Sequence, residues 1–159
     1  MIMKKTIKTN VVLEVFNILN GAKYGKLADE DKIKVWKITR ILKPVATKFE
    51  DDTKDAAEKF KEGYENLDER LQQAQEFEKA QRDESIDASK LKMGAAEYQA
   101  FIKGDWADYN KTVSEAVKDF AEKEVEVEFE PITEEVLGKL MSSNDWSFGQ
   151  ACKLELLIN

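Results

Sequence analysis

The sequence predicts a mainly α protein with a minor β part: a long antiparallel α-helical hairpin over about residues 44–123, short flanking helices and a small two-stranded β element. Three observations predict this class. Apolar residues recur at three- and four-residue spacing along the middle of the chain, residues 124–130 alternate strictly, and only two prolines and seven glycines interrupt 159 residues. This length suits one domain, so we expect a single domain over residues 1–159 whose N- and C-terminal segments pack together as a base.

The N-terminal residues predict a strand followed by a short buried helix. Residues 1–8 tolerate a strand conformation. Asn10 stands where a helix N-cap belongs, the apolar residues 11–19 follow, and Gly21 predicts a left-handed helix end. We expect a loop over residues 21–31, with the acidic residues 29–31 favouring the start of the next helix.

The second helix carries an apolar stripe and one proline. Its clearest stripe alternates by four and three residues and comprises Phe60, Tyr64, Leu67, Leu71 and Ala74. Pro44 predicts a kink or a break, because proline lacks the N–H that a helix uses, and we expect the helix to resume as far as about Arg82. A rod of that length needs a partner rod to cover its apolar face.

A second stripe follows a polar turn around residues 83–89 and supplies that partner. It comprises Tyr98, Phe101, Ile102, Trp106, Tyr109, Val113, Ala116, Val117 and Phe120, with Gly104 as its weak point. We also expect the three tryptophans, Trp36, Trp106 and Trp146, to anchor the packing.

Residues 124–130 form the clearest strand, because valine and phenylalanine alternate with four glutamates. A lone strand leaves backbone groups unpaired, so we expect it to pair with the N-terminal strand and to bring Lys4 and Lys8 near the glutamates. Pro131 ends the strand, Thr133 caps a short helix, and a final helix carries Phe148, Ala151, Leu154, Leu157 and Ile158.

Composition limits the possible functions. The chain has 25 basic and 32 acidic residues, a net charge of −7 and no histidine, which excludes a generally basic surface and removes the usual general base and zinc ligand. Residues 1–48 hold 11 bases and 4 acids, or +7, so the remainder carries −14. The single cysteine, Cys152, has no histidine to activate it and suits a reducing compartment. We expect no cofactor.

Carboxylates are the only groups in the chain that suggest catalysis, because it contains no glycine-rich phosphate loop and no nucleophile motif. Glu62 and Glu65 on one helix and Asp105 and Asp108 on the other have the spacing with which helical nucleotide pyrophosphohydrolases hold Mg²⁺. Glu62 and Glu65 mostly fall away from the apolar stripe, as solvated residues do. We therefore expect no catalytic or metal-ligating residue, with a Mg²⁺-dependent enzyme as an alternative.

Binding to nucleic acid or membrane is not expected either. Six bases surround Trp36 over residues 32–48, but helical spacing spreads them over much of the circumference and not along one stripe. No run approaches the roughly 20 apolar residues that span a bilayer and no targeting segment is evident, so we expect a cytoplasmic protein. An acidic mimic of DNA that inhibits a host protein remains a further alternative.

The order of these features resembles a family. The features, in order, are a Lys26-Leu27 turn, a helix with Ile33, Trp36, Ile38 and Leu42, a long charged helix, and residues 124–132 before a short final helix. This order resembles that of small helical proteins of unknown function from tailed bacteriophages and prophages. Ala28 stands where that family has proline, and the central hairpin is longer. The resemblance implies a phage or prophage origin and a role in virion or tail assembly or in host takeover, and carries over no site residue. We expect a non-enzymatic protein that acts through a protein partner or as a homo-oligomer, in a bacterial cytoplasm or on a virion.

Overall fold

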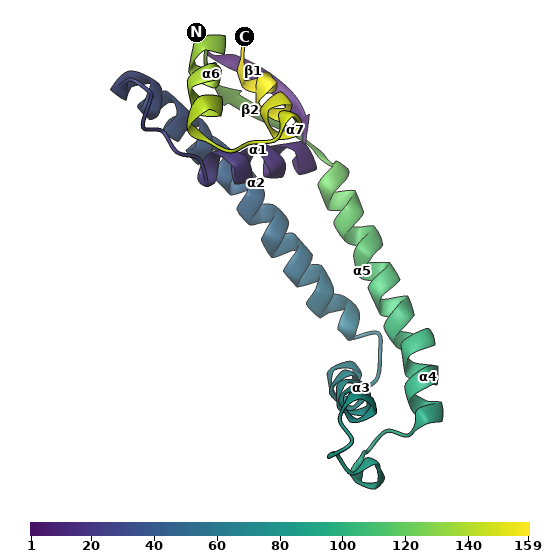
Figure 1. The fold of residues 1–159 in the computed structure, drawn as a ribbon. Helices are drawn as coiled ribbons and strands as arrows, with labels where there is room; N and C mark the ends of the chain where they lie inside the picture. Colours follow the sequence, from purple (N-terminus) through teal and green to yellow (C-terminus); the bar gives the residue numbers. More distant parts are fainter. The chain divides into compact units, whose positions relative to one another are not determined.

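A computed structural model describes all residues, 1–159, and confirms the mainly α class with a minor β part (Figure 1). In chain order the elements are β1 (Met3–Lys8), α1 (Thr9–Asn20), α2 (Asp29–Lys61), α3 (Leu67–Arg82), the 3₁₀ turn η1 (Ala88–Lys90), α4 (Ala95–Lys103), α5 (Asp105–Glu122), β2 (Glu124–Phe129), α6 (Glu134–Ser143), α7 (Phe148–Lys153) and the 3₁₀ turn η2 (Leu154–Leu157).

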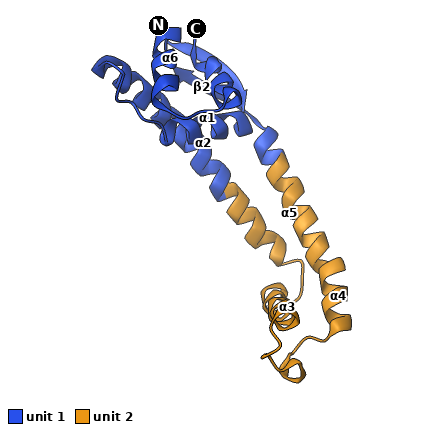
Figure 2. Ribbon diagram, in the orientation of Figure 1, with its two compact units in different colours: residues 1–51, 119–159 blue, residues 52–118 orange.

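The chain divides into two compact units, each with its own core (Figure 2). Unit 1 comprises residues 1–51 and 119–159, and unit 2 comprises residues 52–118. Helix α2 begins in unit 1 and ends in unit 2, whereas α5 begins in unit 2 and ends in unit 1. The single domain expected over residues 1–159 stays a prediction.

The two strands pair as the alternation predicted. β1 runs antiparallel to β2, with Met3 opposite Phe129 and Lys8 opposite Glu124. The Lys4 Nζ lies 2.9 Å from a carboxylate oxygen of Glu126 and 3.8 Å from one of Glu128. All three side chains are more than half exposed, so each pair contributes only ~0.2–1 kcal/mol.

The core of unit 1 lies between the sheet and the helices around it. It comprises Val12, Val15, Leu19, Leu27, Val35, Ile38, Leu42, Val127, Phe129, Ile132, Val136, Leu137, Leu140, Leu154 and Leu157. The chain ends also meet in this unit, because the Lys5 Nζ donates to the Leu156 carbonyl at 2.6 Å. Ile132 and Ile158 form a parallel bridge, in which the Ile132 amide donates to the Leu157 carbonyl at 2.9 Å.

The core of unit 2 is built from residues of both predicted stripes. Leu67, Ala74, Met93, Phe101 and Tyr109 are buried, and Phe60, Tyr64, Leu71, Tyr98, Ile102, Trp106 and Val113 pack against them. The Tyr109 hydroxyl donates to the Ala57 carbonyl at 2.8 Å, which joins α5 to the end of α2. The predicted stripes therefore do pack together over these residues.

The predicted continuous helix to Arg82 is wrong. Helix α2 ends at Lys61, and α3 starts only at Leu67. The amide of Gly63 donates to the Phe60 carbonyl at 3.2 Å, an i to i−3 bond that tightens the last turn. Asn66 then adopts a left-handed conformation, with φ 50° and ψ 43°, and this reverses the backbone before α3.

Two predictions about helix boundaries in unit 1 are corrected. Helix α1 begins at Thr9, not after an Asn10 cap, because the Thr9 amide and hydroxyl both donate to the Lys123 carbonyl, at 2.9 and 2.7 Å. Gly21 does end α1, but with φ −99° and not in a left-handed conformation. The predicted Thr133 cap is confirmed, since its hydroxyl oxygen accepts from the Val136 amide at 3.2 Å.

Helix α2 is continuous through Pro44, so of the predicted kink or break, the break is wrong. Pro44 lies on the exposed side of α2, while the neighbouring Leu42 and Ala46 are buried. Burial of these residues holds the helix together although proline removes one backbone hydrogen bond.

Candidate protein-binding face of helix α2

The four carboxylates considered as a metal site lie at the α2–α3 connection and at the start of α5. Glu62 and Glu65 are exposed in the connection. Asp105 is half-buried and accepts a hydrogen bond from the Arg70 Nη2 at 2.9 Å, and Asp108 accepts one from the Tyr64 hydroxyl at 2.5 Å. This hydrogen bond to Asp108 raises the pKa of Tyr64 above its ordinary value.

These contacts tie the two aspartates to other side chains. Nowhere in the chain do three acidic or cysteine side chains gather closely enough to hold a metal ion. The arrangement around Asp105 and Asp108 is instead a polar network that links α3 and the 62–66 connection to α5.

A shallow hollow of about 380 Å³ opens beside this network in unit 2. Its lining residues are Arg70, Gln73, Met93, Glu97, Ala100, Phe101, Gly104 and Asp105. The Arg70 guanidinium lies over the Phe101 ring at 5.1 Å and pairs with Asp105, and its Nε donates to the Glu65 carbonyl at 2.9 Å. Since Asp105 already pairs with Arg70, the hollow offers no unpaired positive charge to a ligand.

A different surface stands out in unit 1, on the first half of α2. Val35, Ile38 and Leu42 face the core of the unit, with 1% or less of each side chain exposed. The opposite side presents Ile33, Trp36 and Ile41, which are 53%, 54% and 38% exposed. Three large apolar side chains exposed within nine residues of one helix favour a binding site. We call this surface, with the bases Lys37, Arg40 and Lys43, the α2 face.

Bases follow these apolar side chains along α2, whereas Glu30, Asp31 and Glu130 line a hollow with Ile33 and Lys37 at the start of the face. From position 32 to position 49 the chain has six bases and no acid. Lys32 and Lys34 lie 3.5 Å from Asp29 and 3.4 Å from Glu130, so neighbours in the same unit compensate their charges. Lys37 and Lys43 are exposed and form no ion pair, and the Arg40 guanidinium lies over the Trp36 ring at 4.7 Å.

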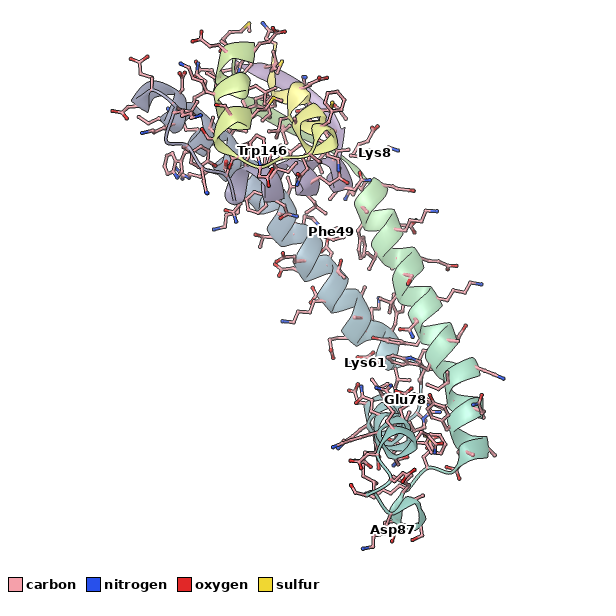
Figure 3. All side chains as sticks on the ribbon, in the orientation of Figure 1. Lys8, Phe49, Lys61, Glu78, Asp87 and Trp146 are labelled. Atoms are coloured by element: carbon pink, nitrogen blue, oxygen red, sulfur yellow. The ribbon has the colours of Figure 1, made fainter.

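The structure corrects the prediction for Trp36. Trp106 and Trp146 do pack against the cores of units 2 and 1, as expected for anchors, and Figure 3 labels Trp146 among the C-terminal elements. Trp36 does not, because Val35 takes the core position beside it. The bases lie outside the buried stripe of α2, over much of the remaining circumference, as predicted. The acid-free interval around a tryptophan was the signal in the sequence that marked this face.

Comparisons with known proteins leave these observations to stand alone. No protein-family model, curated protein or solved structure matches the chain. Every helix is too short or too polar to span a bilayer.

Proposed function

We propose that the chain is a non-enzymatic protein that binds another protein through the α2 face, and that it comes from a phage or prophage and works in the bacterial cytoplasm or on a virion. The exposure of Ile33, Trp36 and Ile41 along one side of a helix whose other side is in the core carries this proposal. The phage setting rests on the order of sequence features described above.

Energetics support a protein partner. Tryptophan and arginine are the residues most often found to dominate the free energy of protein–protein binding. The Arg40 guanidinium lies over the Trp36 ring on the α2 face, so part of the entropy of ordering the two side chains is already lost before binding. A partner that covers the exposed halves of a tryptophan and an isoleucine removes their apolar surface from water. This burial stabilises the complex by ~25 cal/mol for each Å² of apolar surface covered.

Affinity capture from the cells that naturally produce the chain tests the proposal. The wild-type protein, Trp36→Ser and Phe148→Ser serve as baits, and the captured protein is identified and then purified for a direct binding measurement. Phe148 is 83% exposed on α7, so its substitution is a matched loss of exposed apolar surface elsewhere in unit 1.

We expect the purified partner to bind wild type and Phe148→Ser equally and Trp36→Ser at least about tenfold more weakly, the ratio that ~1.4 kcal/mol gives. Equal binding by all three baits would contradict a role for the α2 face.

A further inference from the structure

We infer that the partner presents an acidic amphipathic helix, which lies along the α2 face. Its apolar side chains pack on Ile33, Trp36 and Ile41, and its carboxylates pair with Lys37, Arg40 and Lys43. This inference rests on the proposed function and adds the chemistry of the partner.

The spacing on α2 suits a helical partner. Ile33, Lys37, Arg40 and Ile41 follow one another at intervals of one helical turn or less, the i, i+4, i+7, i+8 pattern by which helices recognise each other. From Ile33 to Lys43 the face extends about 15 Å at 1.5 Å per residue. A partner helix of about three turns covers that length.

Charge complementarity selects an acidic helix over a basic or neutral one. Within the molecule, Asp29 and Glu130 compensate Lys32 and Lys34, and Glu30, Asp31 and Glu130 line a hollow with Lys37. No carboxylate forms an ion pair with Lys37, Arg40 or Lys43. These three bases lie between and beside the exposed apolar side chains, so a partner that lies along Ile33, Trp36 and Ile41 comes close to them. Burying them without carboxylates would leave positive charges desolvated, which is costly.

The same geometry disfavours single-stranded nucleic acid. Nucleic-acid bases bind proteins by stacking on open aromatic faces, and the Arg40 guanidinium leaves at most one face of the Trp36 ring for stacking. The net charge of −7 also repels a polyanion at long range, whereas a short acidic helix has fewer charges to bring near the rest of the molecule.

Two synthetic peptides of about three to five turns test the inference. Both have leucine at the positions of one helical stripe, and one has glutamate and the other lysine at the flanking positions. Fluorescence anisotropy of the labelled peptides measures binding to the full chain at low and high salt. The variants are Lys37→Glu/Arg40→Glu, the neutral pair Lys37→Ser/Arg40→Ser, and a control.

The control is Lys111→Glu/Lys118→Glu. It changes two exposed lysines of α5 and shifts the net charge by the same amount as the first variant. Circular dichroism melts verify that each variant is folded, and the neutral pair keeps the test valid if the charge reversal does not fold.

We expect the wild type and the control to bind the acidic peptide at least about tenfold more tightly than the basic one, with a preference that falls as salt rises. The neutral pair should lose that preference, and the charge reversal should invert it.

Three outcomes would overturn the inference. Equal binding of both peptides would show that the α2 face does not discriminate between an acidic and a basic helix. In that case the proposed function still stands if Trp36→Ser no longer binds the captured partner. Preferential binding of an oligothymidylate that requires Lys37 and Arg40 identifies nucleic acid as the ligand. A dimer in light scattering that Trp36→Ser dissociates identifies a second copy of the chain as the occupant.

Discussion

At the scale of single residues, the Tyr64–Asp108 hydrogen bond gives a pH-dependent prediction. The bond to Asp108 raises the pKa of Tyr64, so the tyrosine binds its proton more tightly in the folded chain than in the unfolded one. Its contribution to stability is therefore present below about pH 10, the ordinary tyrosine value, and is lost as the pH rises through the folded-state value.

Replacing Asp108 by asparagine tests that assignment. We expect Asp108→Asn to lower the pKa of Tyr64, because the amide carries no charge that favours the protonated phenol. The difference between the tyrosinate absorbance titrations of wild type and variant measures it. Superimposable titration curves would show that the two side chains do not interact in solution.

Gly104, between α4 and α5, gives a second prediction at this scale. A Cβ atom added there would lie 2.6 Å from the Ala100 carbonyl oxygen, a backbone atom that cannot move aside cheaply. We expect Gly104→Ala to destabilise the chain by roughly 1–3 kcal/mol in urea denaturation. Gly25→Ala is the control, since its Cβ meets nothing within 4 Å and the substitution should be neutral or stabilising. Equal effects of the two substitutions would refute the close approach.

At the scale of secondary-structure elements, Pro44 is a weak point that α2 tolerates. We expect Pro44→Ala to raise the free energy of unfolding by about 1–3 kcal/mol, because alanine restores the bond from residue 44 to the Arg40 carbonyl. Thr47→Ala, also exposed on α2, controls for helix propensity and should gain only about 0.5 kcal/mol. A lower free energy of unfolding for Pro44→Ala than for wild type would contradict the view that the missing hydrogen bond makes Pro44 a weak point of α2.

Elements with a clear periodicity could be predicted from the sequence, whereas their ends could not. The alternation of Val125 and Val127 with glutamates predicted the strand β2, and its pairing with β1 followed because a lone strand leaves backbone groups unpaired and the N-terminus is the only other strand-like segment. The break between α2 and α3 did not, because the left-handed conformation of Asn66 has no periodic signal and the apolar spacing continues across it.

Only part of the candidate site could be predicted from the sequence, for a related reason. Val35 and Trp36 both fit the apolar stripe of α2, and only packing against the rest of unit 1 decides that Val35 is buried and Trp36 exposed. The acid-free run of bases was visible, but the side of the helix on which Lys37 and Arg40 lie depends on that same choice.

At the scale of the whole molecule, two separate cores predict two levels of local stability. Leu67 is 3% exposed in the core of unit 2, so Leu67→Asp buries an unpaired charge there and should destabilise that unit by roughly 3 kcal/mol or more. We expect hydrogen exchange to accelerate over residues 52–118 and to stay slow in the core of unit 1.

Gln99→Asp introduces the same carboxylate at an exposed position of α4 and should leave exchange unchanged. Uniform acceleration along the entire chain in Leu67→Asp would show that the molecule unfolds as one cooperative unit.

Site-specific photo-crosslinking in the producing cells tests most directly whether the α2 face is where the protein meets its partner. A photoreactive phenylalanine analogue replaces Trp36 in one variant and the exposed Gln99 of α4 in another. We expect position 36 to form a covalent adduct with one other polypeptide and position 99 to form none. Adducts from position 99 alone, or from neither position, would contradict the assignment of binding to this face.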